Sequence, residues 1–315
     1  MIEVKNLSKN YGPVPAVKNI SFTVEKGYIY GFLGPNGAGK STTMNMITGC
    51  LATTQGEITI NGHDVIDDAV EAKRCIGYLP EIPPLYTDMT PFEYLEFVGM
   101  AKGLKKAALY DGIEEAMEKT GISEVADRLI KNLSKGYKQR VGIAQAIIGN
   151  PDIIILDEPT VGLDPIQILE IRTLIKELGR EHTVILSSHI LQEIEAVCDR
   201  VIMISKGNIV ADDTLEALTA EESLEEAFVR LAGESLDAGA AYAMEKAEAA
   251  AEAEAEKAAQ STKGKKKVIV DSDLGPAYYS EVYVDEEPEA LDADEDSSED
   301  EDEEYKPMFS QEDEE

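Results

Sequence analysis

The chain has 315 residues and no tryptophan, and its 62 Asp and Glu residues outweigh 29 Lys and Arg residues to give a formal net charge of −33. This acidity argues against a nucleic-acid-binding surface, so we expect no nucleic acid partner. The charge is uneven, because residues 232–315 contain 28 acidic and 7 basic residues. We therefore predict a folded domain over residues 1–231 and a disordered low-complexity tail over residues 232–315, Ala/Glu/Lys-rich at first and then acidic.

The cysteines and the hydropathy of the chain exclude further classes. Cys50, Cys75 and Cys198 lie far apart and form no CxxC pair, so neither a disulfide scaffold nor a thiolate zinc site is indicated, and we expect all three to be buried. No stretch reaches the ~18 apolar residues of a membrane span, and the amino terminus lacks a signal-peptide pattern. These features predict a cytoplasmic chain. If it works at a membrane, another polypeptide supplies the membrane-spanning part.

The first 79 residues have the pattern of strands interrupted by one helix. Short alternating or β-branched runs separated by glycine-bearing turns predict strands. The helix is expected to begin in the glycine-rich stretch at residues 34–39 and to end near Cys50. The strand runs are Ile2–Leu7, Ile20–Val24, Tyr28–Leu33 and Glu57–Ile60.

A helical subdomain follows over about residues 88–150. Thr90 is placed as an N-cap, with Pro91 at the first helical position and Glu93 completing a capping box. Strands and helices then alternate again, and apolar strands separated by helices predict an α/β core with a parallel sheet. The later elements are a strand at Ile153–Leu156, a helix from Pro165 to about Arg180, a strand at Thr183–Ser187 and a hairpin around Lys206-Gly207.

A glycine-rich loop carries the first chemical signal. The sequence GPNGAGKS over residues 34–41 fits the phosphate-loop pattern and follows an apolar strand, as its mechanism requires. Successive backbone N–H groups converge on a phosphate, Lys40 neutralises phosphate oxygens, and the Ser41 hydroxyl is placed to bind Mg²⁺. The predicted nucleotide-binding residues here are Gly34, Pro35, Asn36, Gly37, Ala38, Gly39, Lys40, Ser41 and Thr42.

A second signal is the sequence IIILDEPT over residues 153–160. A buried strand that ends in adjacent carboxylates holds them at the edge of the sheet where a phosphate loop would lie. Asp157 then fits the Mg²⁺ shell, and Glu158 fits the base or polariser of the attacking water.

With these two motifs and those that follow, the chain resembles the ATP-binding subunits of ABC transporters over about residues 1–231. LSKGYKQR at residues 133–140 stands in the position of the family's signature, GLDP at residues 162–165 in that of the D-loop, and His189 in that of the switch histidine; Tyr11 matches the aromatic residue that stacks on adenine. The resemblance implies a P-loop NTPase of ABC type, with a mixed sheet core, an antiparallel β subdomain and the inserted helical subdomain. It also implies Mg-dependent hydrolysis of ATP.

The resemblance further implies a dimer and a membrane partner. Ser134 can cap the helix that follows it, and with the Gly136 amide it forms an anion site that the family offers to ATP held by the opposite subunit. Asp164 of the D-loop joins the expected nucleotide-binding residues. The catalytic residues are expected to be Lys40, Glu81, Glu158 and His189, and the Mg²⁺ ligands Ser41, Glu81 and Asp157. A multi-span permease would place the chain peripherally on the inner face of the cell membrane.

Two positions depart from the family's commonest pattern. The signature has Lys135 and Tyr137 where glycine and glutamine are usual, although Ser134 and Gly136 remain. The Q-loop position holds Glu81 in place of glutamine, and its carboxylate can still meet Mg²⁺ or water. We expect activity to be preserved with altered tuning. With the segment after Glu81, the pattern is similar to bacterial exporter ATPases of the sodium-, drug- and gliding-motility-related class.

The function expected is an ATP-hydrolysing, energy-coupling subunit of an exporter, and the alternative is a soluble ABC ATPase acting on the ribosome or on DNA. The acidity and the single nucleotide-binding domain disfavour the alternative. The cargo and the choice between homodimer and heterodimer stay open. In the proline-stiffened segment at residues 81–89, Leu85 and Tyr86 are candidates for contact with the permease, or else they pack into the helical subdomain.

Overall fold

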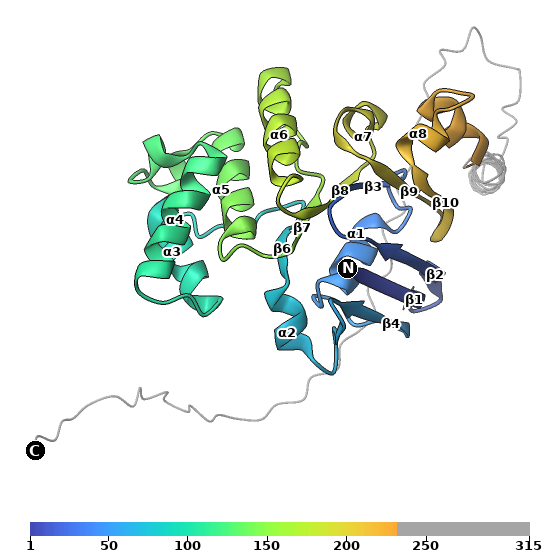
Figure 1. Cartoon of the computed structure of the whole chain (residues 1–315), viewed down its shortest axis with the longest axis horizontal. Helices are drawn as coiled ribbons and strands as arrows, with labels where there is room; N and C mark the ends of the chain where they lie inside the picture. Colours follow the sequence, from blue (N-terminus) through green and yellow to red (C-terminus); the bar gives the residue numbers. More distant parts are fainter. Residues whose placement is uncertain (232–315) are drawn as a thin grey trace, which may run out of the picture. The chain divides into compact units, whose positions relative to one another are not determined.

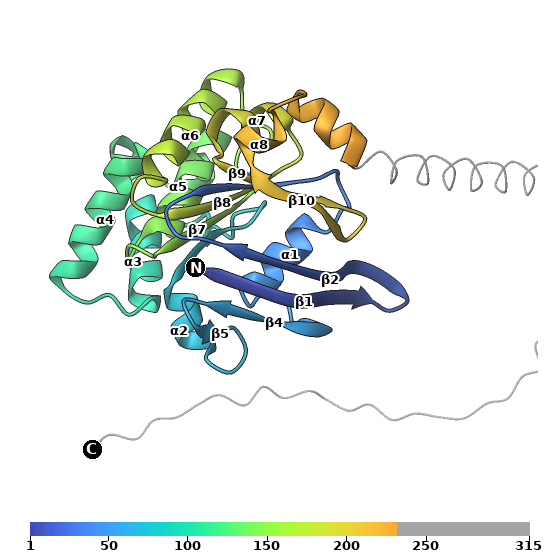
Figure 2. The ribbon, with the colours of Figure 1, turned by 45° about the vertical axis from the view of Figure 1, so that its right-hand side comes forward.

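The structure is a computed structural model and describes residues 1–231 (Figures 1 and 2). A six-stranded sheet in the order β10-β9-β3-β8-β7-β6 forms its centre. Five of these strands run parallel, and β10 pairs antiparallel with β9. Their bounds are β3 (Ile29–Leu33), β6 (Ile76–Leu79), β7 (Ile153–Asp157), β8 (Thr183–Ser188), β9 (Arg200–Ser205) and β10 (Asn208–Thr214). The predicted mixed sheet with its closing hairpin is confirmed.

A second, four-stranded antiparallel sheet has the order β2-β1-β4-β5. Its bounds are β1 (Ile2–Tyr11), β2 (Val14–Val24), β4 (Gln55–Ile60) and β5 (His63–Asp64). In β1 and β4, apolar side chains alternate with polar ones because one face of the sheet packs on the core and the other meets solvent. This sheet is the antiparallel β subdomain that the family resemblance implied.

The central sheet separates two hydrophobic cores, which is why its strands lack a polar face. Successive side chains of β7 point to opposite faces. Ile153 and Ile155 pack in the core shared with the antiparallel sheet and α1 (Lys40–Ile47). Ile154 and Leu156 pack in the core shared with the helices on the other face. Because both faces of β7 are buried, the strand is held firmly at the point where it ends in Asp157.

The helical subdomain comprises α3 (Pro91–Ala101), α4 (Ala107–Thr120) and α5 (Lys135–Ile147), grouped on one side of the domain away from the antiparallel sheet (Figure 1). The capping box predicted for α3 is present: Glu93 N donates to Thr90 Oγ1 at 3.2 Å, and Thr90 N donates to Glu93 Oε2 at 2.8 Å. Short 3-10 turns at Ser123–Val125 and Ile130–Asn132 join α4 to α5.

The remaining helices include several that the sequence did not reveal. One helix was expected before residue 79, but α2 (Ala69–Arg74) follows α1. Only α6 (Pro165–Leu178) was predicted among the later ones; α7 (Leu191–Val197) and α8 (Leu215–Leu218) were not. These helices are too short to show a clear apolar period. Residues 224–231 are also helical, and Leu224 and Ala227 are fully buried.

Three further expectations concern the cysteines, membrane-spanning helices and the tail. Cys198 is buried, but the expectation was wrong for Cys50, which is exposed, and for Cys75, which is partly exposed. Within residues 1–231, no helix has both the length and the apolar character needed to cross a membrane. The tail predicted over residues 232–315 lies outside the described residues, so the domain boundary stays a prediction.

Candidate functional site

The candidate residues gather where three neighbouring parallel strands end. In the order β3-β8-β7, the carboxyl ends of the strands lie at the same edge of the sheet. The glycine-rich loop follows β3, Asp157 is the last residue of β7, and His189 follows β8. Segments more than a hundred residues apart in the chain are thus brought together by the strand order.

The glycine-rich loop folds as an anion cradle. Gly37 and Gly39 have φ angles of 79° and 109°, in the region that favours glycine. At Gly39 a Cβ atom would also lie 2.7 Å from the Ala16 carbonyl oxygen, so a side chain is excluded. The loop leads into the N-terminus of α1, whose first N–H groups are available to phosphate oxygens. Buried Lys40 donates from Nζ to the Gly34 carbonyl oxygen at 2.9 Å.

An oxygen-rich pair lies beside this loop. Ser41 Oγ donates to Asp157 Oδ1 at 3.3 Å, and the Ser187 hydroxyl also donates to Asp157 Oδ1. Burial raises the pKa of Asp157, while these hydrogen bonds act in the opposite direction. Hydroxyl and carboxylate oxygens are the ligands that Mg²⁺ prefers, and one or two carboxylates suffice when phosphate supplies the rest. Within residues 1–231, no cluster of three or more His, Cys, Asp or Glu forms a complete metal cage.

Glu158 is held in an unusual backbone conformation. Its φ angle is 50°, which is uncommon for a residue with a side chain and is kept only where the surroundings enforce it. Glu158 N donates to the carbonyl oxygen of Ser187 at 3.1 Å and to its Oγ at 3.2 Å. The neighbouring strand β8 therefore fixes the direction in which the Glu158 side chain points.

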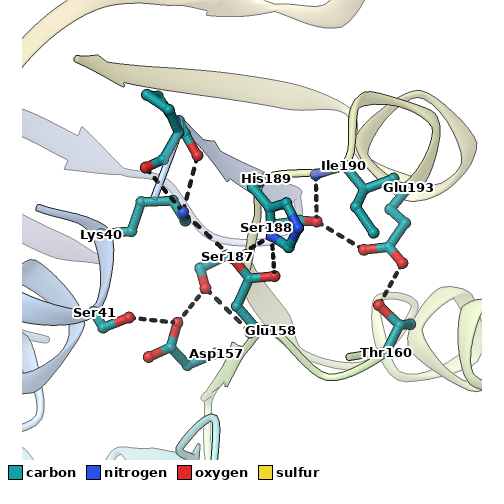
Figure 3. A network of polar contacts seen from close by, with 12 residues as sticks. Lys40, Ser41, Asp157, Glu158, Thr160, Ser187, Ser188, His189, Ile190 and Glu193 are labelled. Carbon is teal, nitrogen blue, oxygen red and sulfur yellow. Dashed lines mark hydrogen bonds and ion pairs between the residues drawn. The ribbon is translucent and has the colours of Figure 1, made fainter. Parts of the chain in front are cut away.

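The Glu158 carboxylate lies between Lys40 and His189, as Figure 3 shows. Lys40 Nζ is 3.3 Å from Oε1, and His189 Nδ1 is 3.0 and 2.9 Å from the two carboxylate oxygens. Three of the predicted catalytic residues thus form one connected group of opposite charges and hydrogen-bonding atoms.

A cavity of about 440 Å³ opens over this group. Glu81 lines it together with residues of the loop and the three predicted catalytic residues, so the departure at the Q-loop position lies in the same site. Tyr11 does not line it; it is half-exposed at the end of β1, opposite Val14 in the hairpin that leads to Ala16. The lining residues are Ala16, Asn36, Gly37, Gly39, Lys40, Ser41, Thr42, Glu81, Glu158, Val161 and His189.

The other predicted nucleotide-binding residues form a separate group. Ser134 caps α5, where its hydroxyl accepts a hydrogen bond from Tyr137 N at 3.3 Å. Asp164 caps α6 by accepting from two backbone N–H groups at 3.0 Å each. Gly136 packs against the Gln167 side chain, so close that a Cβ atom would lie 2.7 Å from it. None of these residues lines the cavity over Lys40.

Sequence reasoning missed part of the polar network. Four residues are buried and hydrogen-bonded next to the predicted catalytic residues, but none was singled out for a role of its own: Thr160, Ser187, Ser188 and Glu193. The pair of serines at the end of an apolar strand was an available signal, because such hydroxyls require partners when buried. Glu193 offered no comparable signal.

Comparison with known proteins identifies this architecture. Residues 17–161 match the family described as ABC transporter. The ABC transporter ATP-binding protein NatA of Bacillus subtilis is 41% identical, over 68% of this chain and 87% of the relative. The chain belongs to the ABC transporter ATP-binding family. The bacitracin transport ATP-binding protein BcrA of Bacillus licheniformis is 40% identical, over 67% of this chain and 69% of the relative.

Solved structures agree with this assignment. An ATP-binding subunit of an ABC transporter superposes with a TM-score of 0.67 and 32% identity, covering 73% of this chain and 99% of that one. A bacterial ABC transporter cassette whose structure is dimeric gives a TM-score of 0.63 and 28% identity, covering 68% and 99%. The same cassette is also known as a dimer bound to ADP and Pi after hydrolysis. This ABC ATPase is an ATP-binding and ATP-hydrolysing subunit of a transporter, and the alternative of a ribosome- or DNA-acting enzyme is not favoured.

Proposed function

We propose that this ABC ATPase hydrolyses ATP at two composite sites of a dimer and thereby drives export through a separate permease. The separation of the two residue groups carries the proposal. Lys40, Glu158 and His189 line one cavity, whereas Ser134 and Gly136, at the start of α5, do not line it. A second subunit brings its Ser134 group to the first subunit's cavity, and the dimeric cassette structure supports this arrangement.

Each residue of the cavity has a role that follows from its position. The loop N–H groups and Lys40 hold the β- and γ-phosphates of ATP. Glu158 orients the attacking water and accepts its proton, while His189 contacts the γ-phosphate and keeps the Glu158 carboxylate in place. Glu81 lies at the rim of the same cavity, where its carboxylate contacts water or the metal ion. Tyr11 stacks on the adenine from the edge of the antiparallel sheet.

Ser41 and Asp157 would hold Mg²⁺ in this site. Their oxygens already lie 3.3 Å apart, and phosphate oxygens complete the ligand set. The ion would neutralise charge on the β- and γ-phosphates. Glu81 is a further candidate ligand, because it is an acidic residue that lines the same cavity.

The permease is proposed to dock on an apolar surface beside the cavity. We define the docking surface as Ile82, Tyr86 and Phe97, which are 83%, 50% and 43% exposed. Leu85 instead packs partly buried against the core of the helical subdomain, so Tyr86 is the better of the two candidates chosen from the sequence. Docking there would place the chain peripherally on the inner face of the cell membrane.

Export is the direction of transport that the relatives favour. The curated relatives include a bacitracin transport protein, a linearmycin resistance protein and a lantibiotic transport protein of Streptococcus pyogenes, 36% identical over 72% of this chain and 96% of the relative. These names describe the relatives, and they support an exporter of an amphipathic or peptide-like compound. The residues that select the cargo would lie in the permease.

Glu158→Gln tests the proposed chemistry. It should abolish steady-state hydrolysis of Mg–ATP and still allow an ATP-dependent dimer, since the amide keeps the shape of the side chain but does not accept the proton. Lys40→Ala should instead weaken ATP binding itself. ATPase assays combined with size-exclusion chromatography in ATP separate the two outcomes. Undiminished hydrolysis by Glu158→Gln would reject the role assigned to Glu158.

A further inference from the structure

Glu193 is a buried acid for which the proposed chemistry has no role. It lies in the first turn of α7, and its residue is 1% exposed. Both of its carboxylate oxygens accept hydrogen bonds from hydroxyl groups: Thr160 donates to Oε1, and Ser188 donates to Oε2 at 2.7 Å (Figure 3). The carboxylate therefore joins two segments that are nearly thirty residues apart in the chain.

These segments are the ones that carry the catalytic group. Thr160 lies two residues after Glu158, and Ser188 lies immediately before His189. Ser188 Oγ also accepts a hydrogen bond from Ile190 N at 3.0 Å, so the backbone is fixed on both sides of His189. Through these contacts, Glu193 ties the end of β7 to the end of β8 on the side of His189.

Burying the Glu193 carboxylate costs free energy, which indicates that its link between the two segments has a role other than stability. A carboxylate loses most of its hydration on burial, and two hydroxyl donors recover only part of that free energy. Thr160 and Ser188 are themselves buried, so each would lose its partner if Glu193 were replaced by an apolar residue. The main effect of such a fully hydrogen-bonded network is to hold its residues in one arrangement, and its contribution to the free energy of unfolding is smaller.

We propose that Glu193 is a positioning residue for ATP hydrolysis. It holds the two segments in the register in which His189 Nδ1 lies within 3.0 Å of both oxygens of Glu158. The proposal rests on the roles proposed above for Glu158 and His189. A loss of register lowers the rate of the chemical step and leaves ATP binding intact, because the network includes no residue of the phosphate loop.

Glu193→Gln is the first test, measured in the full chain. The amide keeps the size of the side chain but replaces one acceptor oxygen with an NH₂ donor, so one hydroxyl contact is lost or reversed. We expect kcat to fall by roughly 10-fold or more, with KM for ATP changed less than about twofold. The matched control is Glu195→Gln, an exposed position on the same helix, which should leave kcat and KM unchanged.

The ring signals of histidine give a readout that a merely structural role would not move. The chain has only 3 histidines, so NMR spectra of histidine-labelled protein are readily assigned with His189→Ala. Glu193→Gln should shift the His189 ring signals and leave those of His63, which pairs with Asp68 at another site, in place. The Glu195→Gln control should shift neither.

Two other variants cover a failure of Glu193→Gln to fold. Thr160→Val and Ser188→Ala each remove one hydroxyl, and each should lower kcat in the same direction. Wild-type kcat in a folded Glu193→Gln, or in both of these variants, would overturn the proposal. Reduced kcat with unmoved His189 signals and lower thermal stability would also overturn it, as a structural effect. If Glu158→Gln and His189→Ala kept full turnover, the proposed function would fail first and separately.

Discussion

The buried carboxylate of Asp157, a proposed Mg²⁺ ligand, lowers the stability of the folded protein. Burial raises its pKa above the ordinary value of 3.8. The folded state therefore binds the proton more tightly than the unfolded state does. As the pH rises from 3.8 through the raised pKa, the free energy of unfolding falls, because the folded protein must then hold a buried charge.

Asp157→Asn should therefore make the protein without nucleotide more stable at neutral pH. The Asn carbonyl oxygen can still accept from the Ser41 and Ser187 hydroxyls, whereas the buried charge is gone. The gain should shrink as the pH is lowered through the raised pKa and below 3.8, where the wild-type carboxyl becomes protonated in the unfolded state as well as in the folded state. Urea unfolding across this pH range measures it, with exposed Asp67→Asn as the control. A less stable variant at neutral pH would show that the carboxylate's hydrogen bonds outweigh its desolvation.

At the scale of single residues, the sequence was sufficient to predict those site residues that occur at fixed spacing in a motif. Lys40, Ser41, Asp157 and Glu158 occupy fixed places in motifs next to apolar strands, and the structure brings them together with His189. Glu193 could not be found in that way. Its burial depends on how a seven-residue helix packs, and its partners come from two distant strand ends.

At the scale of elements, the contact between β6 and α5 is close enough to require a glycine. A Cβ atom at Gly77 would lie 1.9 Å from the Ala146 carbonyl oxygen of α5, and neither backbone can move without disturbing a core. This contact packs α5, the helix that Ser134 caps, against the edge strand of the central sheet. The helical subdomain is therefore joined to the sheet by backbone packing as well as by side chains.

Gly77→Ala should lower the free energy of unfolding by about 3 kcal/mol. Gly112→Ala is the matched control, because Gly112 lies inside α4 and a Cβ atom there would meet only Leu104 Cδ1, at 3.8 Å. That substitution should instead stabilise the protein by roughly 0.5–1 kcal/mol, since alanine is the better helix former. Chemical denaturation of both variants decides the matter; equal effects would contradict the close packing.

Elements were predicted well where an apolar pattern or a cap was strong. The strands β7 and β8 and the helices α3 and α6 begin within a residue of their predicted starts, because Thr90 and Asp164 cap the two helices. The short helices α2 and α7 were missed, since six or seven residues do not repeat an apolar period often enough to distinguish it from a loop.

At the scale of the whole molecule, the folded unit is expected to need residues up to about 231. Leu224 and Ala227 are buried, and Phe228 and Leu231 pack against the same core. A chain ending after residue 231 should keep the ATPase activity and the melting temperature of the full chain. A chain ending after residue 222 should lose about 2–5 kcal/mol through the missing Leu224 alone. Loss of activity in the chain that ends after residue 231 would show that the folded domain extends into the tail.

Assembly with the permease provides the second prediction at this scale. The Tyr86 ring is half-exposed and packs edge-on to Tyr94, with ring centroids 6.0 Å apart. Tyr86→Ala should leave the melting temperature and ATP binding of the isolated subunit nearly unchanged but weaken co-purification with a co-expressed permease. Leu85→Ala, at the packed neighbour, should lower the melting temperature instead. A lower melting temperature of Tyr86→Ala with normal co-purification would contradict the proposed docking surface.

The cap at the start of α5 has a consequence for how a dimer could signal that ATP is present. Ser134 Oγ accepts from Tyr137 N, which occupies a lone pair and leaves the hydroxyl hydrogen free. The Ser134 side chain can thus cap the N-terminus of α5 and still donate a hydrogen bond to a phosphate oxygen of ATP bound by the other subunit. Aspartate would cap equally well but would repel the phosphate, and alanine would do neither. Serine suits this position because its one hydroxyl group can accept the capping hydrogen bond and donate another to phosphate.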